Sequence, residues 1–133
     1  MVNSWDFFDT LLGRSTGREP WRLFDLVDGP DFRPLRQRAE AEAPDKTLAG
    51  IYRQLALITG WPATRLERLK IREWELELAA AYPIVENTRR VAAGDLVVSD
   101  TYLTSDEIRQ LADRIGLPAG IEIVATYGGK HHG

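Results

Sequence analysis

The middle of the chain, residues 19–82, has the hydrophobic periodicity of helices, because its apolar residues recur every three or four positions. Its first predicted helix begins at Pro20, a residue favoured at the first helical position, and Trp21, Phe24 and Val27 follow at a spacing of three. The pattern therefore predicts that the whole segment is helical.

Turn residues and caps divide this segment further. Asp28-Gly29-Pro30 breaks the first helix, and a charged helix over 31–43 ends at Pro44. Thr47 is a candidate N-cap for the next helix, which Gly60 ends. The longest predicted helix runs from about residue 63 to 81. We expect its apolar stripe to consist of Ile71, Trp74, Leu78 and Tyr82, widened by Leu69 and Leu76.

The pattern changes to buried strands towards the end of the chain. Leu96-Val97-Val98 is a short β-branched run that reads as a strand, and Ile121–Ala125 is a second one. Between them, Thr104 and Glu107 form a capping-box pattern that starts a helix, with Ile108, Leu111 and Ile115 facing inward. A strand, a helix and a strand at this spacing predict a parallel crossover unit of an α/β layer.

The opening apolar run, Trp5 to Leu12, is too short to distinguish a helix from a strand by periodicity. If it is a strand, the fold is a three-stranded α/β core interrupted after its first strand by a helical insertion. The domain prediction is then a discontinuous core of residues 1–13 and 84–133, with residues 14–83 as the insertion.

Composition and charge exclude several classes of protein. Seventeen basic and twenty acidic residues give a net charge of −3, whereas a nucleic-acid-binding domain is usually basic. The absence of cysteine excludes disulfides and thiolate chemistry. No apolar run approaches the roughly 20 residues of a membrane span, and the N-terminal residues do not resemble a signal peptide. We therefore expect a cytoplasmic protein without nucleic-acid or membrane partners.

Polar groups follow each predicted strand of the core, where α/β sheets bind ligands. Asp6 lies in the first run, Ser99 and Asp100 follow the second, and Lys130 follows the third. A carboxylate, a hydroxyl and an ammonium group at neighbouring strand ends suit attack on a phosphoryl group, with the carboxylate as nucleophile. Each feature alone is more often a turn, cap or solvated residue, so the prediction depends on their order and spacing together.

That ordered set resembles the haloacid dehalogenase (HAD) superfamily of aspartyl-nucleophile hydrolases. Its first motif, Asp-x-Asp-x-Thr after a strand, resembles Asp6-Phe7-Phe8-Asp9-Thr10, which implies that Asp6 is the nucleophile and Thr10 the motif threonine. Its second motif, a strand ending in Ser or Thr, resembles the run that ends at Ser99, and its third, a Lys after the next strand, corresponds to Lys130. The helical insertion lies where this superfamily places a cap.

The resemblance covers essentially the whole chain and is closest to one bacterial branch of HAD hydrolases, some of them associated with surface-polysaccharide glycosyltransferases. The segments that resemble this branch are Arg38-Ala39-Glu40, Ile51-Tyr52, Glu73 to Glu77, and Ser99 to Leu103. It implies that Asp100 positions the second-motif loop and that Tyr102 lines the substrate pocket beneath the cap. A structural role for both residues is the alternative.

Two departures from the superfamily affect the expected chemistry. Phe8 stands where HAD phosphatases have an Asp that acts as general acid and base. The dehalogenase branch also lacks this Asp. The fourth motif, one or two Asp residues that complete a Mg²⁺ site, is absent, which leaves Asp6 and the Phe8 backbone carbonyl as protein ligands. The adjacent histidines, His131 and His132, are poor substitutes for it.

Three functions follow from this pattern. The first is a phosphatase acting on a small phosphate ester with Mg²⁺, and the second is a metal-independent dehalogenase-like hydrolase. The third is a truncated, non-catalytic HAD-like domain that binds or interacts. The expected fold is an incomplete HAD-type, Rossmann-like parallel sheet with a helical cap inserted after the first strand. Without a fourth strand, the first strand would be an exposed edge, through which we expect a homodimer or a partner chain to pair.

Overall fold

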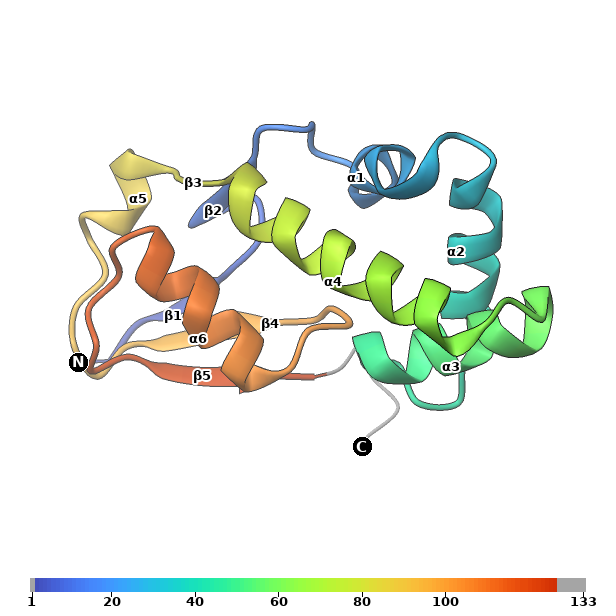
Figure 1. The fold of residues 1–133 in the computed structure, drawn as a ribbon. Helices are drawn as coiled ribbons and strands as arrows, with labels where there is room; N and C mark the ends of the chain where they lie inside the picture. The colour runs from blue at the N-terminus through green and yellow to red at the C-terminus, as the bar shows by residue number, and fades with distance from the viewer. Residues whose placement is uncertain (1, 127–133) are drawn as a thin grey trace. The chain divides into compact units, whose positions relative to one another are not determined.

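The computed structural model describes residues 2–126 and has a mixed α/β architecture (Figure 1). The chain divides into two compact units. One consists of Met1–Ser15 together with Ala80–Gly133 and contains all the strands, and the other is Thr16–Ala79. The predictions that the middle of the chain is helical and that its two ends together form an α/β unit are both confirmed.

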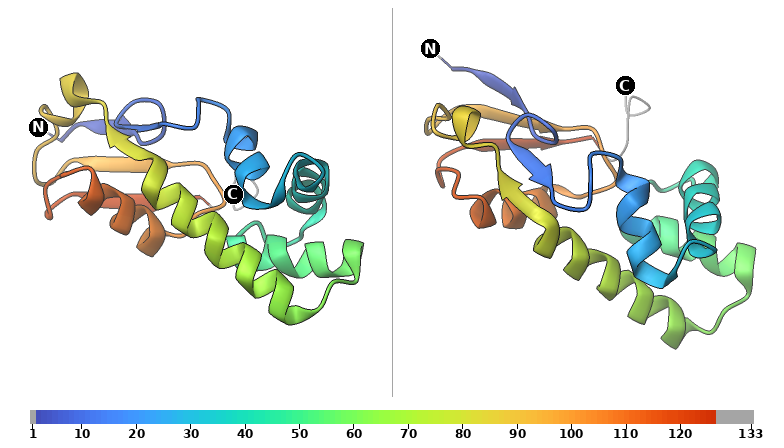
Figure 2. Two further views of the ribbon diagram at one scale, coloured as in Figure 1. Left: turned by 45° about the horizontal axis from the view of Figure 1, so that its top comes forward. Right: turned by 90° about the horizontal axis from the view of Figure 1, so that it is seen from above.

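The first unit is built on a three-stranded parallel sheet with the order β1-β4-β5. Its strands are β1 (Ser4–Asp6), β4 (Leu96–Ser99) and β5 (Glu122–Ala125). Helix α6 (Ser105–Arg114) connects β4 to β5 and lies against one face of the sheet in all views (Figures 1 and 2). The predicted parallel crossover is therefore present, and β1 is an edge strand of this sheet among the described residues.

The register of the sheet separates its side chains into a buried and a more exposed face. Trp5, Val97 and Ile123 are paired across the strands, and Val97 is fully buried. One position further along, Asp6 is paired with Val98, and Val98 with Val124, whose exposure is 43%. Because successive side chains of a strand point to opposite faces, these three residues lie on the more exposed face.

The capping box predicted for α6 is present. The Thr104 hydroxyl accepts the Glu107 amide at 3.2 Å, and the Glu107 carboxylate accepts the Thr104 amide at 2.8 Å. The three residues predicted to face inward, Ile108, Leu111 and Ile115, are all buried. The helix therefore begins where the Thr104 and Glu107 side chains accept hydrogen bonds from each other's backbone amides. The face that the spacing predicted to be buried is buried.

Two short elements of this unit were not predicted. Strands β2 (Leu12–Arg14) and β3 (Ala81–Pro83) pair in antiparallel orientation, and a short helix, α5 (Val85–Thr88), follows. The apolar pattern predicts that the opening run stops at Leu12, whereas the next residue, Gly13, lies within β2, where an added Cβ would collide with the Tyr82 ring. Pairing between distant segments, which local periodicity does not record, stabilises these strands.

The second unit consists of four helices: α1 (Pro20–Asp28), α2 (Phe32–Glu42), α3 (Leu48–Thr59) and most of α4 (Ala63–Ala80). The predicted caps of α3 are confirmed. The Thr47 hydroxyl accepts the Gly50 amide at 3.1 Å, and Gly60 ends the helix at a φ of 69°, in the left-handed region that favours glycine.

The predicted apolar stripe of α4 is confirmed for Leu69, which is buried, and wrong for Ile71 and Tyr82. Ile71 is 49% exposed, and Tyr82, which is 48% exposed, belongs to β3 rather than to the helix. The buried residues of α4 are Leu66, Leu69, Glu73, Glu77 and Ala80. Two of them, Glu73 and Glu77, carry carboxylates, so apolar periodicity alone does not define the buried face of the helix.

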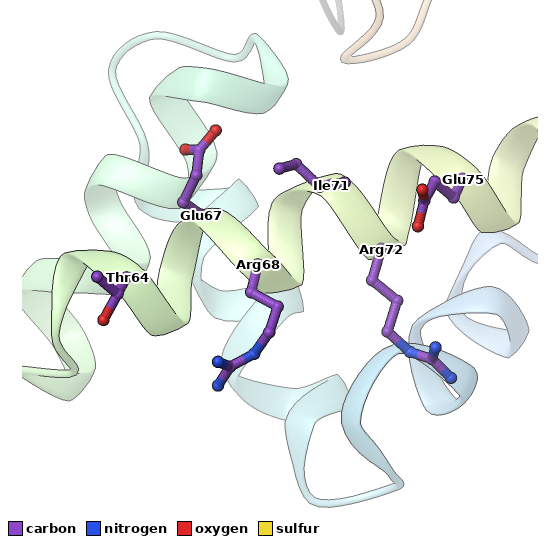
Figure 3. A pocket seen from close by; sticks show the side chains of 6 residues that line it. All are labelled: Thr64, Glu67, Arg68, Ile71, Arg72 and Glu75. Carbon is purple, nitrogen blue, oxygen red and sulfur yellow. The ribbon is translucent and has the colours of Figure 1, made fainter.

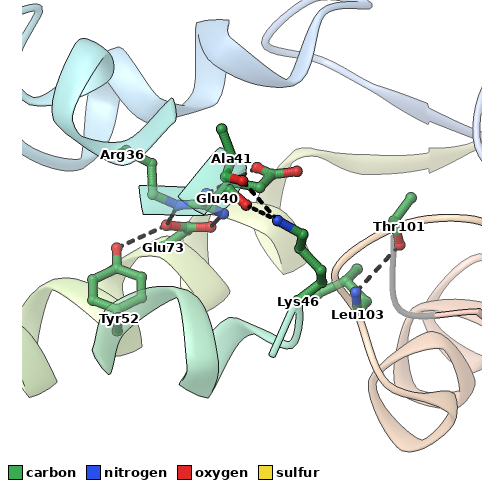
Figure 4. Close-up of polar contacts among 8 residues, drawn as sticks. All are labelled: Arg36, Glu40, Ala41, Lys46, Tyr52, Glu73, Thr101 and Leu103. Atoms are coloured by element: carbon green, nitrogen blue, oxygen red, sulfur yellow. Dashed lines mark hydrogen bonds and ion pairs between the residues drawn. The ribbon is translucent and has the colours of Figure 1, made fainter. Parts of the chain in front are cut away.

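An ion pair explains why a carboxylate lies on the buried face of α4 (Figure 4). Arg36 of α2 donates through Nε and Nη2 to the two carboxylate oxygens of Glu73, at 2.9 and 2.7 Å. The Tyr52 hydroxyl of α3 donates to the same carboxylate at 2.7 Å. The Arg36 guanidinium also lies over the Phe24 ring at 4.3 Å. Glu73 thus connects three of the helices through charged and polar contacts.

Candidate functional site

The carboxyl ends of β1 and β4 bring two predicted site residues to one edge of the sheet. Asp6 is the last residue of β1, and Ser99 is the last residue of the adjacent strand β4. The register pairs Asp6 with Val98, so Ser99 lies one position beyond it. Asp6 is exposed to solvent, whereas Ser99 is only 2% exposed. Within the strands, alternation therefore directs the two side chains to opposite faces.

The segment after Asp6 turns tightly rather than continuing as a strand. The Phe7 amide still donates to the Val98 carbonyl at 3.0 Å, but the Phe7 carbonyl accepts the amides of Leu11 and Leu12. Asp9 has a φ of 65°, in the left-handed region that only a few residue types adopt readily. The nucleophile candidate consequently lies where the extended chain ends and the loop begins.

Hydrogen bonds from α5 and the segment before it hold the end of the loop that is farther along the chain from β1. The Thr10 carbonyl accepts a hydrogen bond from the Asn87 side chain at 2.9 Å, and the Leu11 carbonyl accepts the Ile84 amide at 2.9 Å. Thr10 itself is partly buried. The loop that carries the first-motif resemblance is therefore anchored at both ends by backbone hydrogen bonds.

Phe8 is packed as a structural aromatic residue. Its ring meets the Phe7 ring edge-on with centroids 5.1 Å apart, and the Arg14 guanidinium lies over it at 4.2 Å. Its side chain has no proton to transfer, so acid–base chemistry at this position has to come from solvent or from another residue.

The second predicted segment forms a hydroxyl pair at the end of β4. The Ser99 and Thr101 hydroxyl oxygens are 3.0 Å apart. The Thr101 oxygen also accepts a hydrogen bond from the Leu103 amide at 3.3 Å (Figure 4). Thr101 is partly exposed. Sequence reasoning did not single out Thr101, although its position two residues after the strand-ending Ser99 is a spacing at which local hydroxyl contacts form.

Asp100 and Tyr102, the two predicted substrate-binding residues, differ in their surroundings. The exposed Asp100 carboxylate accepts the Thr126 hydroxyl at 2.8 Å, and Thr126 also donates its amide to the Ser99 carbonyl at 2.9 Å. Tyr102 is buried, with 5% exposure. Asp100 thus ties the loop after β4 to the end of β5. Lys130, the predicted third-motif residue, lies outside the described residues.

The described residues offer little protein ligation for a metal ion. No group of three His, Cys, Asp or Glu residues within 2–126 is arranged to hold one. The ligands that the sequence suggested are the Asp6 carboxylate and the Phe8 carbonyl. Mg²⁺ in enzymes is often held by one or two carboxylates together with substrate phosphate and water, and these two oxygens would be the protein's contribution to such a site.

At the other end of the sheet, a buried carboxylate fixes the start of β1. Asp95, next to the first residue of β4, accepts hydrogen bonds from the Ala92 amide at 2.9 Å, the Asn3 amide at 3.1 Å and the Trp5 indole at 3.1 Å. These donors, the Ala92 amide first, hold the pKa of Asp95 below its usual range. This role is structural, and the sequence pattern did not single out Asp95 for it.

A pocket of about 580 Å³ lies along α4, and none of the predicted site residues lines it (Figure 3). It is lined by Thr64, Glu67, Arg68, Ile71, Arg72 and Glu75. Arg68 and Arg72 extend from the same side of the helix in this view. The Arg72 guanidinium donates hydrogen bonds to the backbone carbonyls of Leu26 and Val27. The lining comes from one helix, and its charges are of both signs, so the pocket does not resemble a built catalytic site.

Within the described part of the chain, none of the helices has the combination of length and apolar composition that a bilayer span requires. No known protein-family model matches the chain, and no curated protein matches its sequence significantly.

Proposed function

We propose that the chain is a HAD-type hydrolase that uses Asp6 as an aspartyl nucleophile and acts on a small phosphate ester. The observation that carries the proposal is the position of Asp6: an exposed carboxylate at the carboxyl end of a parallel strand, next to a strand that ends in a pair of hydroxyl groups. Parallel sheets bind ligands at the carboxyl ends of their strands. The resemblance of Asp6–Thr10 to the superfamily's first motif supports the same role for Asp6.

The proposed reaction proceeds in two displacements. An Asp6 carboxylate oxygen attacks phosphorus, the bond to the ester oxygen breaks, and an acyl phosphate forms on Asp6. Water then attacks the acyl phosphate, which releases inorganic phosphate and restores the carboxylate. Hydrogen bonds from the hydroxyl pair at the end of β4, with Lys130 as a proposed third donor, stabilise the negative charge on the phosphoryl oxygens.

Phe8 limits the substrates that fit this mechanism. With no carboxyl group at that position to protonate the leaving oxygen, the departing group has to leave as an anion or take its proton from water. Esters of acidic alcohols, such as aryl phosphates, are therefore the expected substrates. Mg²⁺ held by Asp6 and the Phe8 carbonyl would neutralise charge on the phosphoryl oxygens.

A dehalogenase-like hydrolase is the second candidate, and the packing of Phe8 favours it. In that reaction Asp6 displaces a halide from carbon and forms an alkyl ester, a step that requires neither a proton donor at position 8 nor a metal ion. Release of halide from a 2-haloacid in the presence of a chelator would distinguish it from the phosphatase.

Detection of the covalent intermediate tests the first proposal. The protein is mixed with an aryl phosphate, quenched in acid and digested, and the peptides are analysed by mass spectrometry. We expect phosphate on the peptide that contains Asp6 and none in the Asp6→Asn variant. A phosphorylated peptide elsewhere, or the same modification in the variant, would remove Asp6 from the nucleophile's role.

A further inference from the structure

We propose that two copies of the chain pair in antiparallel orientation through the edges of their β1 strands, and that Arg90 of each copy binds the Asp6 carboxylate of the other. The proposal starts from a small pocket of about 190 Å³ beside β1, lined by Asn3, Ser4, Trp5 and Arg90. The pocket and the strand belong to the same compact unit. In the part of the chain that the structure describes, β1 has a neighbouring strand on one side only.

The charges beside this edge are complementary between two copies. Of the four residues that line the pocket, Arg90 alone is charged, and it is exposed. Its side chain forms no hydrogen bond or ion pair with another residue within 2–126, and the same holds for the exposed Asp6 carboxylate. Each copy therefore offers a second copy one cation and one anion along the same short strand.

The backbone of β1 limits the registers in which two copies can pair. Asn3 and Phe7 form backbone hydrogen bonds with β4, at 2.9 and 3.0 Å, so the backbone groups of Ser4 and Asp6 point away from β4. Two identical strands related by a twofold axis are antiparallel, and each outward-facing residue then has to lie opposite another one.

Three registers near the centre of the strand satisfy this condition, and they differ in their charges and overlap. One places Asp6 opposite Asp6, and like charges directly opposite each other are destabilising. A second is centred on Ser4 and places Asp6 opposite Val2, which lies before the start of β1. The third is centred on Trp5. It places Ser4 opposite Asp6 twice and pairs the whole of β1 with its copy, so it is the favoured register.

In this register Arg90 is within reach of the opposing carboxylate. Directly opposite residues of paired strands have their Cβ atoms about 4.5–5.5 Å apart on the same face, so Asp6 of one copy lies beside Ser4 of the other. Arg90 lines the pocket that Ser4 also lines. The contact occurs twice in the pair and occupies the carboxylate of Asp6. The consequence that the paired form is inactive rests on the proposed function.

An exchange of charges tests the contact by sedimentation at rising protein concentration, because a single short strand forms a small, transient interface. Arg90→Asp and Asp6→Arg should each weaken self-association by at least about tenfold, because two attractive contacts become repulsive. A mixture of the two variants should associate like the wild type, since both contacts of the mixed pair again join opposite charges. Thermal unfolding checks that each variant is folded.

The matched control is Arg89→Asp, because Arg89 is also exposed but does not line the pocket. This variant should associate like the wild type. A folded Arg90→Asp variant that associates normally, or a mixture that associates no better than its components, would overturn the contact. Equal losses in Arg89→Asp and Arg90→Asp would also overturn it, because they would reflect net charge alone.

Turnover of an aryl phosphate tests the consequence separately. The specific activity of the wild type should fall at the concentrations where sedimentation detects the pair, by about twofold when half of the chains are paired. It should stay constant in Arg90→Asp over the same range. Constant wild-type activity would overturn the occupation of Asp6 in the pair. Association that follows the charge exchange, in a protein without turnover at any concentration, would support the pair and reject the proposed function.

Discussion

Arg36 and Glu73 form a bidentate ion pair in which neither side chain is appreciably exposed, at 0% and 1%. Removing one partner of a buried ion pair typically destabilises a protein by about 3–5 kcal/mol. Arg36 would keep a second partner, because its Nη1 also donates to the partly exposed Glu40 carboxylate at 2.9 Å. We therefore expect Glu73→Gln to lower the free energy of unfolding, measured by denaturant titration, by an amount towards the lower end of that range.

The matched control for this variant is Glu67→Gln on the same helix. Glu67 pairs with Lys70 at 3.1 Å, but its side chain is 59% exposed, and surface pairs contribute at most about 1 kcal/mol. Equal effects of the two substitutions would contradict the view that the Glu73 pair organises the helical unit.

Asp95 should make the stability of the sheet unit depend on acidity. Because its pKa is lowered in the folded protein, its contribution to stability is fully present above the ordinary carboxyl pKa and is lost as the pH falls through the lower, folded value. Unfolding measured across the acid range should therefore show a smaller loss of stability with falling pH in Asp95→Asn than in the wild type. Parallel curves for the two proteins would show that the three donors do not favour the charged form.

Among the described residues β1 has a neighbouring strand on one side only, and we expect its other side to pair with a second copy of the chain. Asn3 and Phe7 direct backbone groups towards β4, so the alternate residues Ser4 and Asp6 direct theirs outward. A pocket of about 190 Å³, lined by Asn3, Ser4, Trp5 and Arg90, lies beside this strand. Unpaired strand edges readily pair with other chains.

We expect sedimentation at rising protein concentration to show self-association of the wild type and of Ser4→Ala, and its loss in Ser4→Pro. Proline removes an outward-facing N–H group and leaves the bonds to β4 in place. A wild type that stays monomeric at high concentration, or a folded Ser4→Pro variant that still associates, would count against pairing through this edge.

The sequence predicted best those elements whose signals are local. The capping box of Thr104 and Glu107 and the αL glycine at Gly60 define helix ends through contacts within a few residues, and the structure has both. The parallel strands before and after α6 could also be predicted, because short apolar runs on both sides of a well-defined helix have few alternative arrangements.

The sequence failed where distant residues decide the outcome. The buried face of α4 contains Glu73, whose partner Arg36 is 37 positions away, so periodicity of apolar residues selected the exposed Ile71 instead. Strands β2 and β3 are likewise stabilised by pairing with each other across the helical segment. Within the candidate site, the sequence identified Asp6 and Ser99 by motif, but the contact of Ser99 with Thr101 depends on a loop geometry that a motif does not specify.

The most direct test of the central claim is p-nitrophenyl phosphate turnover by the wild type, Asp6→Asn and Asp9→Asn, each with Mg²⁺ and with a chelator. Asp9→Asn is the matched control, because Asn tolerates the left-handed backbone of this position. We expect turnover that depends on Mg²⁺, is reduced to background in Asp6→Asn and persists in Asp9→Asn. Unchanged turnover in Asp6→Asn would contradict the assigned nucleophile, and no turnover by the wild type under any condition would favour a non-catalytic domain.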